Sequence, residues 1–302
     1  MITLQAGLVK DRSGFERILF AVNDSKESLA AIPFVASLAA ASDALVLVLH
    51  VWSPDESALG QSPRGLSVIE MEELLEHVLG QLRAGRVHAV GESPTALLDR
   101  VPDLIQGRAD SFRADLVVVG NRGLSELHSI FAASRTHQLV SMSNRPVLAV
   151  GSEARRWIGK PRRVLAVLDD GDDGGSVVRA AIDVAAPASA RVDVIHFCAG
   201  SESRLDILAE QLKGSGVFPS WTRGDAQRDP VGQIVHVAIR TESDLVVIAS
   251  DRTSVDSLLP GDVMHRLLGS APCAVLVVPP SAGQTSGRRL HSSVDVLEQR
   301  SA

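Results

Sequence analysis

The sequence predicts an α/β protein built from two tandem doubly wound domains, each a five-stranded parallel sheet flanked by helices. Apolar runs of strand length alternate with helix-length segments, as expected for strands buried on both faces of a parallel sheet. This series occurs twice: "RILFAVN" at 17–23 recurs as "RVLAVLD" at 163–169, and "DLVVVG" at 115–120 recurs as "DLVVIA" at 244–249. The spacing is 146 residues for the first pair and near 128 for the second, so the second copy is shorter in its middle.

The repeat sets the expected domain boundaries. We assign residues 1–14 to an N-terminal tail, 15–152 to the first domain, 153–162 to a linker, 163–280 to the second domain and 281–302 to a polar C-terminal tail. A chain of 302 residues is long enough for two domains of ordinary size, each with a hydrophobic core of its own.

The first domain begins with a strand, a helix and a second strand. Residues 17–22 form a continuous apolar run, which predicts a strand buried on both faces. An Ala- and Leu-rich helix is expected at about 26–41, where Pro33 predicts a kink because it removes an intrahelical hydrogen bond. Residues 44–51 predict the second strand.

The middle of the first domain predicts a loop, two helices and a strand. Residues 53–66 are rich in Ser, Pro and Gly, which is typical of a loop. An amphipathic helix is expected next, because apolar residues recur at spacings of three and four: Val68, Met71, Leu75, Val78, Leu79 and Leu82. Residues 86–90 predict a strand, "GESP" predicts a turn, and Pro94 is suited to the first turn of a helix that runs to about 109.

The first domain ends with a strand at 115–119, a glycine-containing loop, a helix from about 134 to 143 and a strand at 146–150. Ser134 is a good N-cap for this last helix, since its hydroxyl can accept a hydrogen bond from a free backbone N–H. The second copy repeats the series from 163 to 278.

Composition and charge exclude several functional classes. The net charge of −6 and the lack of a basic run argue against nucleic acid as a partner. No apolar run reaches the roughly 18 residues of a membrane helix, and the N-terminus has no apolar core of signal-peptide length. We therefore expect a cytoplasmic protein with no membrane partner. Cys198 and Cys273 have no metal-ligand spacing and are expected to be buried reduced thiols.

Polar residues and glycines follow the first and fourth strands of the first domain. In an open parallel sheet, a ligand binds beyond the carboxyl ends of the strands, where the strand order reverses. If these two strands flank that point, residues 23–25 (Asn23, Asp24 and Ser25) lie on one side of it, and residues 120–123 (Gly120, Asn121, Arg122 and Gly123) lie on the other. Glycines permit close approach of the backbone, and the free N–H groups of a helix N-terminus favour phosphate.

These residues carry a family resemblance. The chain resembles tandem universal stress proteins, an adenine-nucleotide-binding α/β family of the adenine nucleotide alpha hydrolase-like fold. The ATP-binding members carry the pattern G-x2-G-x9-G-[S/T] after the fourth strand and an Asp at the end of the first. The first copy matches at Gly120, Gly123 and Ser134, whereas Ala133 replaces the third glycine and Asn23 replaces the acid.

The resemblance implies a role for each candidate residue. Adenine and ribose would meet Asn23 and Asp24, with Val51 near the end of the second strand. The phosphates of ATP would meet the backbone amides of residues 120–123 and of Ser134, and Mg²⁺ would come only as the counter-ion of the triphosphate. Asn23 can still accept a hydrogen bond from ribose or adenine, although it lacks the charge of the family's aspartate.

The second copy departs from the family pattern at its loop. Asp169 restores the acid at the end of the first strand, but Ala249 and Arg252 stand where the two early glycines would be. Asp262 aligns with Ser134, and its carboxylate would occupy the amides that a phosphate needs and would repel the phosphate. We therefore expect no triphosphate binding in the second domain.

The sequence thus indicates a stress-response regulatory or binding module, with ATP bound in the first domain only. The alternative is a member that binds no nucleotide and acts as a protein-interaction or dimerisation module. By the same resemblance, the last strands at 146–150 and 274–278 pair domains, either within the chain or in a homodimer. No nucleophile–base pair or metal cluster supports an enzyme, and self-phosphorylation at Ser134 lacks a general base.

Overall fold

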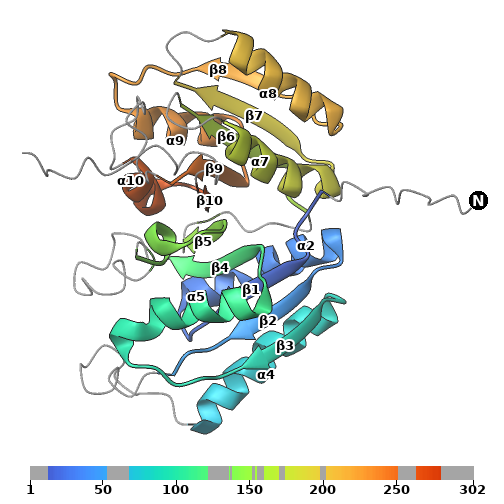
Figure 1. Cartoon of the computed structure of the whole chain (residues 1–302), viewed down its shortest axis with the longest axis vertical. Helices are drawn as coiled ribbons and strands as arrows, with labels where there is room; N and C mark the ends of the chain where they lie inside the picture. The colour runs from blue at the N-terminus through green and yellow to red at the C-terminus, as the bar shows by residue number, and fades with distance from the viewer. Residues whose placement is uncertain are drawn as a thin grey trace, which may run out of the picture.

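The computed structural model describes residues 13–52, 68–121, 136, 138–151, 154, 160–169, 174–197, 202–250 and 263–279. Its strands form one ten-stranded sheet in the order β3-β2-β1-β4-β5-β10-β9-β6-β7-β8 (Figure 1). Counted outward from the middle, the second half repeats the strand order of the first, and neighbouring strands within each half are parallel. The predicted fold class is confirmed, and the two parallel sheets join into one.

The elements described in the first half follow the predicted order, with shifted boundaries at some of them. The strands are β1 (Arg17–Ala21), β2 (Leu45–Leu49), β3 (His88–Glu92), β4 (Leu116–Asn121) and β5 (Val147–Gly151). The helices are α1 (Lys26–Ala30), α2 (Ile32–Ser42), α4 (Val68–Ala84), the 3₁₀ turn η1 (Leu98–Arg100) and α5 (Val101–Phe112). The helix expected from about 134 to 143 is described over residues 138–142.

The second half follows the same plan. Its described strands are β6 (Arg163–Leu168), β7 (Arg191–His196), β8 (Ser220–Arg223), β9 (Leu245–Ala249) and β10 (Ala274–Val278). Its described helices are α7 (Gly175–Ala188), α8 (Glu202–Gly214), α9 (Pro230–Arg240) and α10 (Val263–Ser270). In the described part of the chain, no helix is long and apolar enough to cross a membrane.

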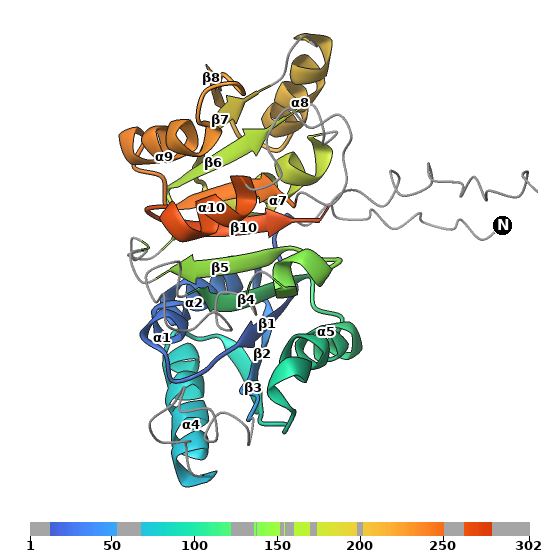
Figure 2. The same cartoon turned by 90° about the vertical axis from the view of Figure 1, so that its left-hand side faces the viewer.

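The two halves meet at an antiparallel seam between β5 and β10. Leu148 lies opposite Leu276, with Ala149–Val275 and Val147–Val277 as the flanking pairs. Figure 2 shows these two strands side by side at the middle of the molecule, with their arrows in opposite directions. The predicted pairing of last strands therefore occurs within the chain. Because each of these strands already has neighbours on both sides, neither leaves a free edge for a second copy.

The hydrophobic interior is organised by sheet face and not by domain. One core lies on the face covered by α2, α4, α7 and α8, and the other on the face covered by α5, α9 and α10. Each core contains residues of both halves, and α2 packs against α7 across the seam. The expectation of a separate core for each domain is wrong, because the β5–β10 pairing makes both faces of the sheet continuous.

Proline and glycine account for the boundaries that differ from the prediction. The helix expected at 26–41 is interrupted at Ala31, because Pro33 has no N–H for the carbonyl four residues before it. A second difference concerns Pro94, which does not start a helix. Its carbonyl accepts a hydrogen bond from the Trp52 N–H at 3.0 Å, and α5 starts at Val101 with a different proline in its first turn.

The predicted "GESP" turn is also corrected, because its first two residues belong to β3. Gly91 faces helix α4, and a Cβ built there would lie 2.9 Å from Leu79 Cδ1 and 3.0 Å from Leu75 Cδ1. The glycine therefore allows the helix to pack closely on this edge strand.

A pair of repeated aspartates fixes the start of the first strand in each half. Asp115 accepts hydrogen bonds from the backbone N–H groups of Glu16 and Arg17 at 2.7 and 3.0 Å. Asp244 accepts the equivalent pair at the start of β6, at 2.7 and 3.1 Å. Burial raises the pKa of the Asp115 carboxyl above its ordinary value, against these backbone hydrogen bonds, which lower it.

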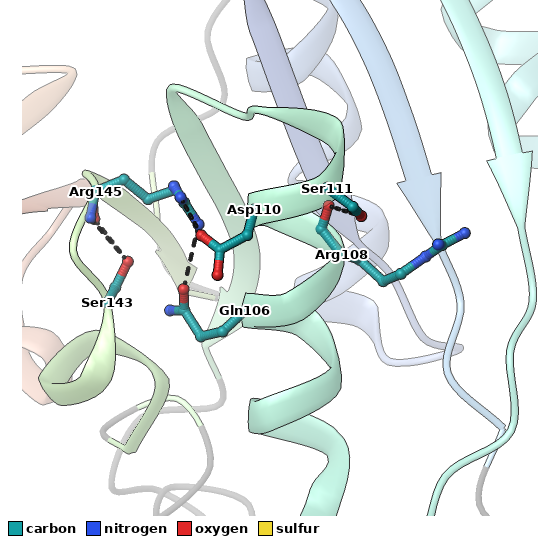
Figure 3. A network of polar contacts seen from close by, with 6 residues as sticks. All are labelled: Gln106, Arg108, Asp110, Ser111, Ser143 and Arg145. Carbon is teal, nitrogen blue, oxygen red and sulfur yellow. Dashed lines mark hydrogen bonds and ion pairs between the residues drawn. The ribbon is translucent and has the colours of Figure 1, made fainter.

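An arginine fixes β5 to the adjacent helix. Arg145 lies just before β5, and its side chain, only 14% exposed, points toward α5 (Figure 3). Its guanidinium donates to Asp110 Oδ1 at 2.5 Å and to Gln106 Oε1 at 3.4 Å. Ser143 Oγ donates to the Arg145 carbonyl at 2.8 Å, which holds the turn that delivers the arginine. These bonds fix the start of the seam strand relative to α5.

Candidate functional site

The strand order places the candidate site where the sequence predicts it. β1 has β2 on one side and β4 on the other, so the order reverses between β1 and β4. The carboxyl ends of these two strands therefore bring residues 22–25 close to Gly120 and Asn121. In the described ranges, no group of three or more His, Cys, Asp or Glu side chains is placed to hold a metal ion.

Asn23 builds the turn that starts helix α1. Its backbone N–H donates to Ser28 Oγ at 3.0 Å, and its Oδ1 accepts from the Ser25 N–H at 3.1 Å. Ser25 in turn caps the helix, because its Oγ accepts from the Ser28 N–H at 3.2 Å. A ribose or adenine donor at Asn23 Oδ1 would therefore share an oxygen that already holds the turn. Asp24 is exposed beside it.

Gly120 has a packing role that its sequence pattern does not reveal. A Cβ built on Gly120 would lie 2.5 Å from the Ser28 backbone nitrogen and 2.7 Å from its Cα. The first turn of α1 therefore crosses the end of β4 at a distance that only glycine allows. Glu27, in the same turn, is buried. Gly120 thus brings the Asn23 turn against the start of the glycine-containing loop.

The residues at the end of the second strand of each half, β2 and β7, pack against neighbouring side chains. Val51 is half-buried and packs against the core on the α5 face. The preceding His50 is buried, with its Nδ1 3.5 Å from Ser93 Oγ. Its counterpart His196 lies edge-on to Trp221, with 6.2 Å between ring centroids. Both histidines are thus part of the packing at the outer side of each half.

Asn121 is one of the predicted residues at the end of the fourth strand, but no local sequence pattern predicts its contact with the other half. Its side chain is only 3% exposed, and its Nδ2 donates to the Leu268 carbonyl of α10, in the other half, at 2.6 Å. The carbonyl needs such a donor, because it lies in the last turn of α10 and the residue four positions later is Pro272, which has no N–H. That proline is the one sequence signal that points to an unsatisfied carbonyl at this place.

The equivalent position in the second half is Ser250, which follows β9 as Asn121 ends β4. Its backbone N–H donates to the Val278 carbonyl at 2.7 Å. Its hydroxyl is buried, yet Oγ has no hydrogen-bond partner within the described part of the chain. Of these two equivalent positions, only Asn121 makes a side-chain hydrogen bond to the other half within the described residues.

We expect Ser250→Ala to leave the free energy of unfolding unchanged or to raise it by about 1 kcal/mol, because a buried hydroxyl without a partner costs free energy. Urea unfolding followed by circular dichroism measures this. Ser143→Ala is the matched control, because its hydroxyl is also buried but bonded, and its loss should cost about 1 kcal/mol. A clear loss of stability in Ser250→Ala would show that the hydroxyl is bonded in solution.

The remaining predicted residues lie outside the described ranges. These are Arg122, Gly123, Ala133 and Ser134 in the first half, and Arg252 and Asp262 in the second. Their assignments therefore stay predictions from the sequence. Asp169 is described, and it lies half-buried just after β6.

Known proteins resemble this chain over most of its length. The sequence model of the universal stress protein family matches residues 14–151 and 202–279. A universal stress protein from Mycolicibacterium smegmatis is 25% identical over 286 residues, which cover 87% of this chain and 97% of that protein. A Thermus aquaticus protein, the universal stress protein in QAH/OAS sulfhydrylase 3′ region, is 31% identical over 144 residues. These residues cover 45% of this chain and 98% of the Thermus protein.

A solved structure agrees with the fold. The crystal structure of a universal stress protein from Archaeoglobus fulgidus superposes on this chain with a TM-score of 0.64 at 18% identity. The superposition covers 87% of this chain and 98% of the Archaeoglobus chain. The similarity therefore includes both halves and the arrangement of their strands.

Proposed function

Because the chain belongs to the universal stress protein family, we propose that it is a binding module of the stress response whose first domain alone takes an adenine nucleotide. The observation that carries this proposal is the place of the glycine loop. It follows β4, whose last two residues are Gly120 and Asn121, next to the end of β1, where doubly wound sheets bind ligands. The same loop matches the family's ATP-binding pattern at Gly120, Gly123 and Ser134.

The chemistry of the loop favours a phosphate-bearing ligand. Backbone amides of residues 120–123 and the helix N-terminus at Ser134 would supply N–H donors and the positive end of a helix dipole. Asp24 and Asn23 would meet the ribose or the base at the end of β1, and Val51 would lie toward the end of β2. Mg²⁺ would accompany the triphosphate as its counter-ion, and the protein would bind the nucleotide without turning it over.

The second domain is proposed not to bind a triphosphate. Ala249 takes the place of Gly120, and Arg252 replaces the second glycine. The carboxylate of Asp262 would stand at the helix N-terminus that a phosphate requires, where two negative charges repel. This domain would instead support the first one through the shared sheet and cores.

A non-nucleotide function, in which the protein acts through protein contacts alone, has its own supporting observation. Asn23 replaces the family's aspartate, and its Oδ1 already closes the turn to the Ser25 N–H. Ala133 adds a methyl group where the family pattern has glycine. Both changes reduce what the site offers to a nucleotide.

Isothermal titration of the full chain with Mg·ATP separates the two functions. The wild-type protein should give saturable heat, and Gly123→Asp should abolish it, because a carboxylate in the phosphate loop repels the triphosphate and blocks the amides. Thr253→Asp is the control, since it adds the same single charge to the loop of the second domain and should leave the heat unchanged. Absence of saturable heat from the wild type at millimolar ATP would favour the protein-contact function.

A further inference from the structure

We propose that Asn121 is a positioning residue that couples the nucleotide site of the first domain to helix α10 of the second. The proposal rests on the proposed function, because the ligand at that site is taken to be an adenine nucleotide. It adds a regulatory link between a ligand in one half and a helix in the other, carried by a single buried amide.

The bond itself is well placed to transmit a displacement. Asn121 Nδ2 and the Leu268 carbonyl are 2.6 Å apart and shielded from water. Because Pro272 removes the carbonyl's helical donor, the Asn121 amide is its replacement partner, and losing it would leave a buried carbonyl unsatisfied. A displacement of Asn121 therefore carries a free-energy cost unless α10 moves with it.

The position of Asn121 ties this bond to the ligand site. Asn121 is the last residue of β4, pairs with Gly151 of β5, and precedes the first residue of the glycine loop. A phosphate that draws the amides of this loop toward itself would act on the end of β4, one peptide from the bonded side chain. Helix α10 contacts β5 and leads into β10 at the seam, so it receives that displacement directly.

The asymmetry between the halves favours coupling over general packing. Ser250 holds the equivalent place in the second half, but its buried hydroxyl makes no side-chain hydrogen bond within the described residues. Of the two equivalent positions, the one that bonds across the halves thus lies in the domain that keeps the glycine loop. The equivalent side chain in the domain whose loop has lost both glycines makes no such bond within the described residues.

Hydrogen–deuterium exchange of α10 in the full chain, with and without Mg·ATP, tests the coupling. In the wild type, Mg·ATP should slow exchange in residues 263–270. In Asn121→Ala this slowing should disappear, and titration should show ATP binding weakened about fivefold, at the lower end of usual coupling free energies. Ser250→Ala should behave as the wild type in both measurements. Asn121→Ser, whose hydroxyl is too short to reach Leu268, provides a second variant with the same expectation.

Several outcomes would overturn the coupling. One is ATP binding to the wild type with no change in α10; another is an α10 response that survives in both Asn121 variants. A wild type that binds no ATP would refute the proposed function instead. In that case, hydrogen–deuterium exchange without ATP still tests whether Asn121 holds α10. The backbone amides of α10 should exchange faster in Asn121→Ala than in the wild type. Equal rates would show that the amide does not hold the helix.

Discussion

Leu148→Ala should lower the free energy of unfolding by about 2–5 kcal/mol, the usual cost of truncating a fully buried leucine. Leu148 lies on β5 at the seam, 1% exposed and directly opposite the equally buried Leu276 of β10. The truncation opens a cavity in the core on the face of the sheet that α2 and α7 cover. Because the strands on both sides of Leu148 are hydrogen-bonded to its strand, the surrounding structure has little freedom to close this cavity. Equilibrium unfolding in urea, followed by circular dichroism, gives the free-energy difference.

The matched control for this prediction is Ile69→Ala. Ile69 is an aliphatic side chain on α4 that is mostly exposed, so its truncation should change stability by no more than about 0.5 kcal/mol. If Leu148→Ala costs as little as Ile69→Ala, the seam between β5 and β10 is not packed in solution as it is in the structure.

Gly120→Ala is expected to cost about 3 kcal/mol of stability, at the upper end of overpacking effects. Its new methyl group would lie 2.5 Å from the backbone nitrogen of Ser28, and a backbone atom cannot turn aside as a side chain can. The first turn of α1 must then move away from β4, and the Asn23 turn moves with it. Urea unfolding measures the loss, and titration with Mg·ATP should show weaker binding by the same variant.

Gly107→Ala separates this steric effect from the general effect of replacing a glycine. Gly107 lies inside helix α5, where a Cβ would have nothing within 4 Å. Alanine should therefore stabilise the protein by about 0.5–1 kcal/mol, because glycine in a helix loses more chain entropy on folding. Equal stability of both variants would mean that α1 does not cross β4 as closely as the structure has it.

The fold could be predicted from the sequence because its main signals are local and occur twice. The apolar runs of β1 and β4 recur in β6 and β9 with their order unchanged, and each reads as a strand buried on both faces. Pro33 likewise marked the irregularity in the first helical segment. The start of α5 could not be predicted in the same way, because Pro94 suits a first helical turn equally well. Its competing contact is with Trp52, which lies 42 residues earlier in the segment after β2.

The candidate site was predictable in its location but not in its detail. The reversal of strand order fixes which strand ends meet, so Asn23, Asp24 and Gly120 could be grouped from topology alone. Their contacts depend on the backbone path of α1, which decides that Gly120 must lack a side chain. Asn121 and Leu268 are 147 residues apart, and no periodicity relates them. Only the missing N–H of Pro272 gives a hint of that contact.

The covalent joining of the two halves has a consequence for how they can evolve. In a homodimer with two-fold symmetry, every substitution appears at both equivalent places, so an amide suited to one side must also suit the other. Here the β5–β10 seam joins two different segments of one chain, and dilution cannot separate them. Each half is therefore free to change without its counterpart. Asn121 can bond across the seam while Ser250 does not, and one half can keep a glycine loop that the other has lost.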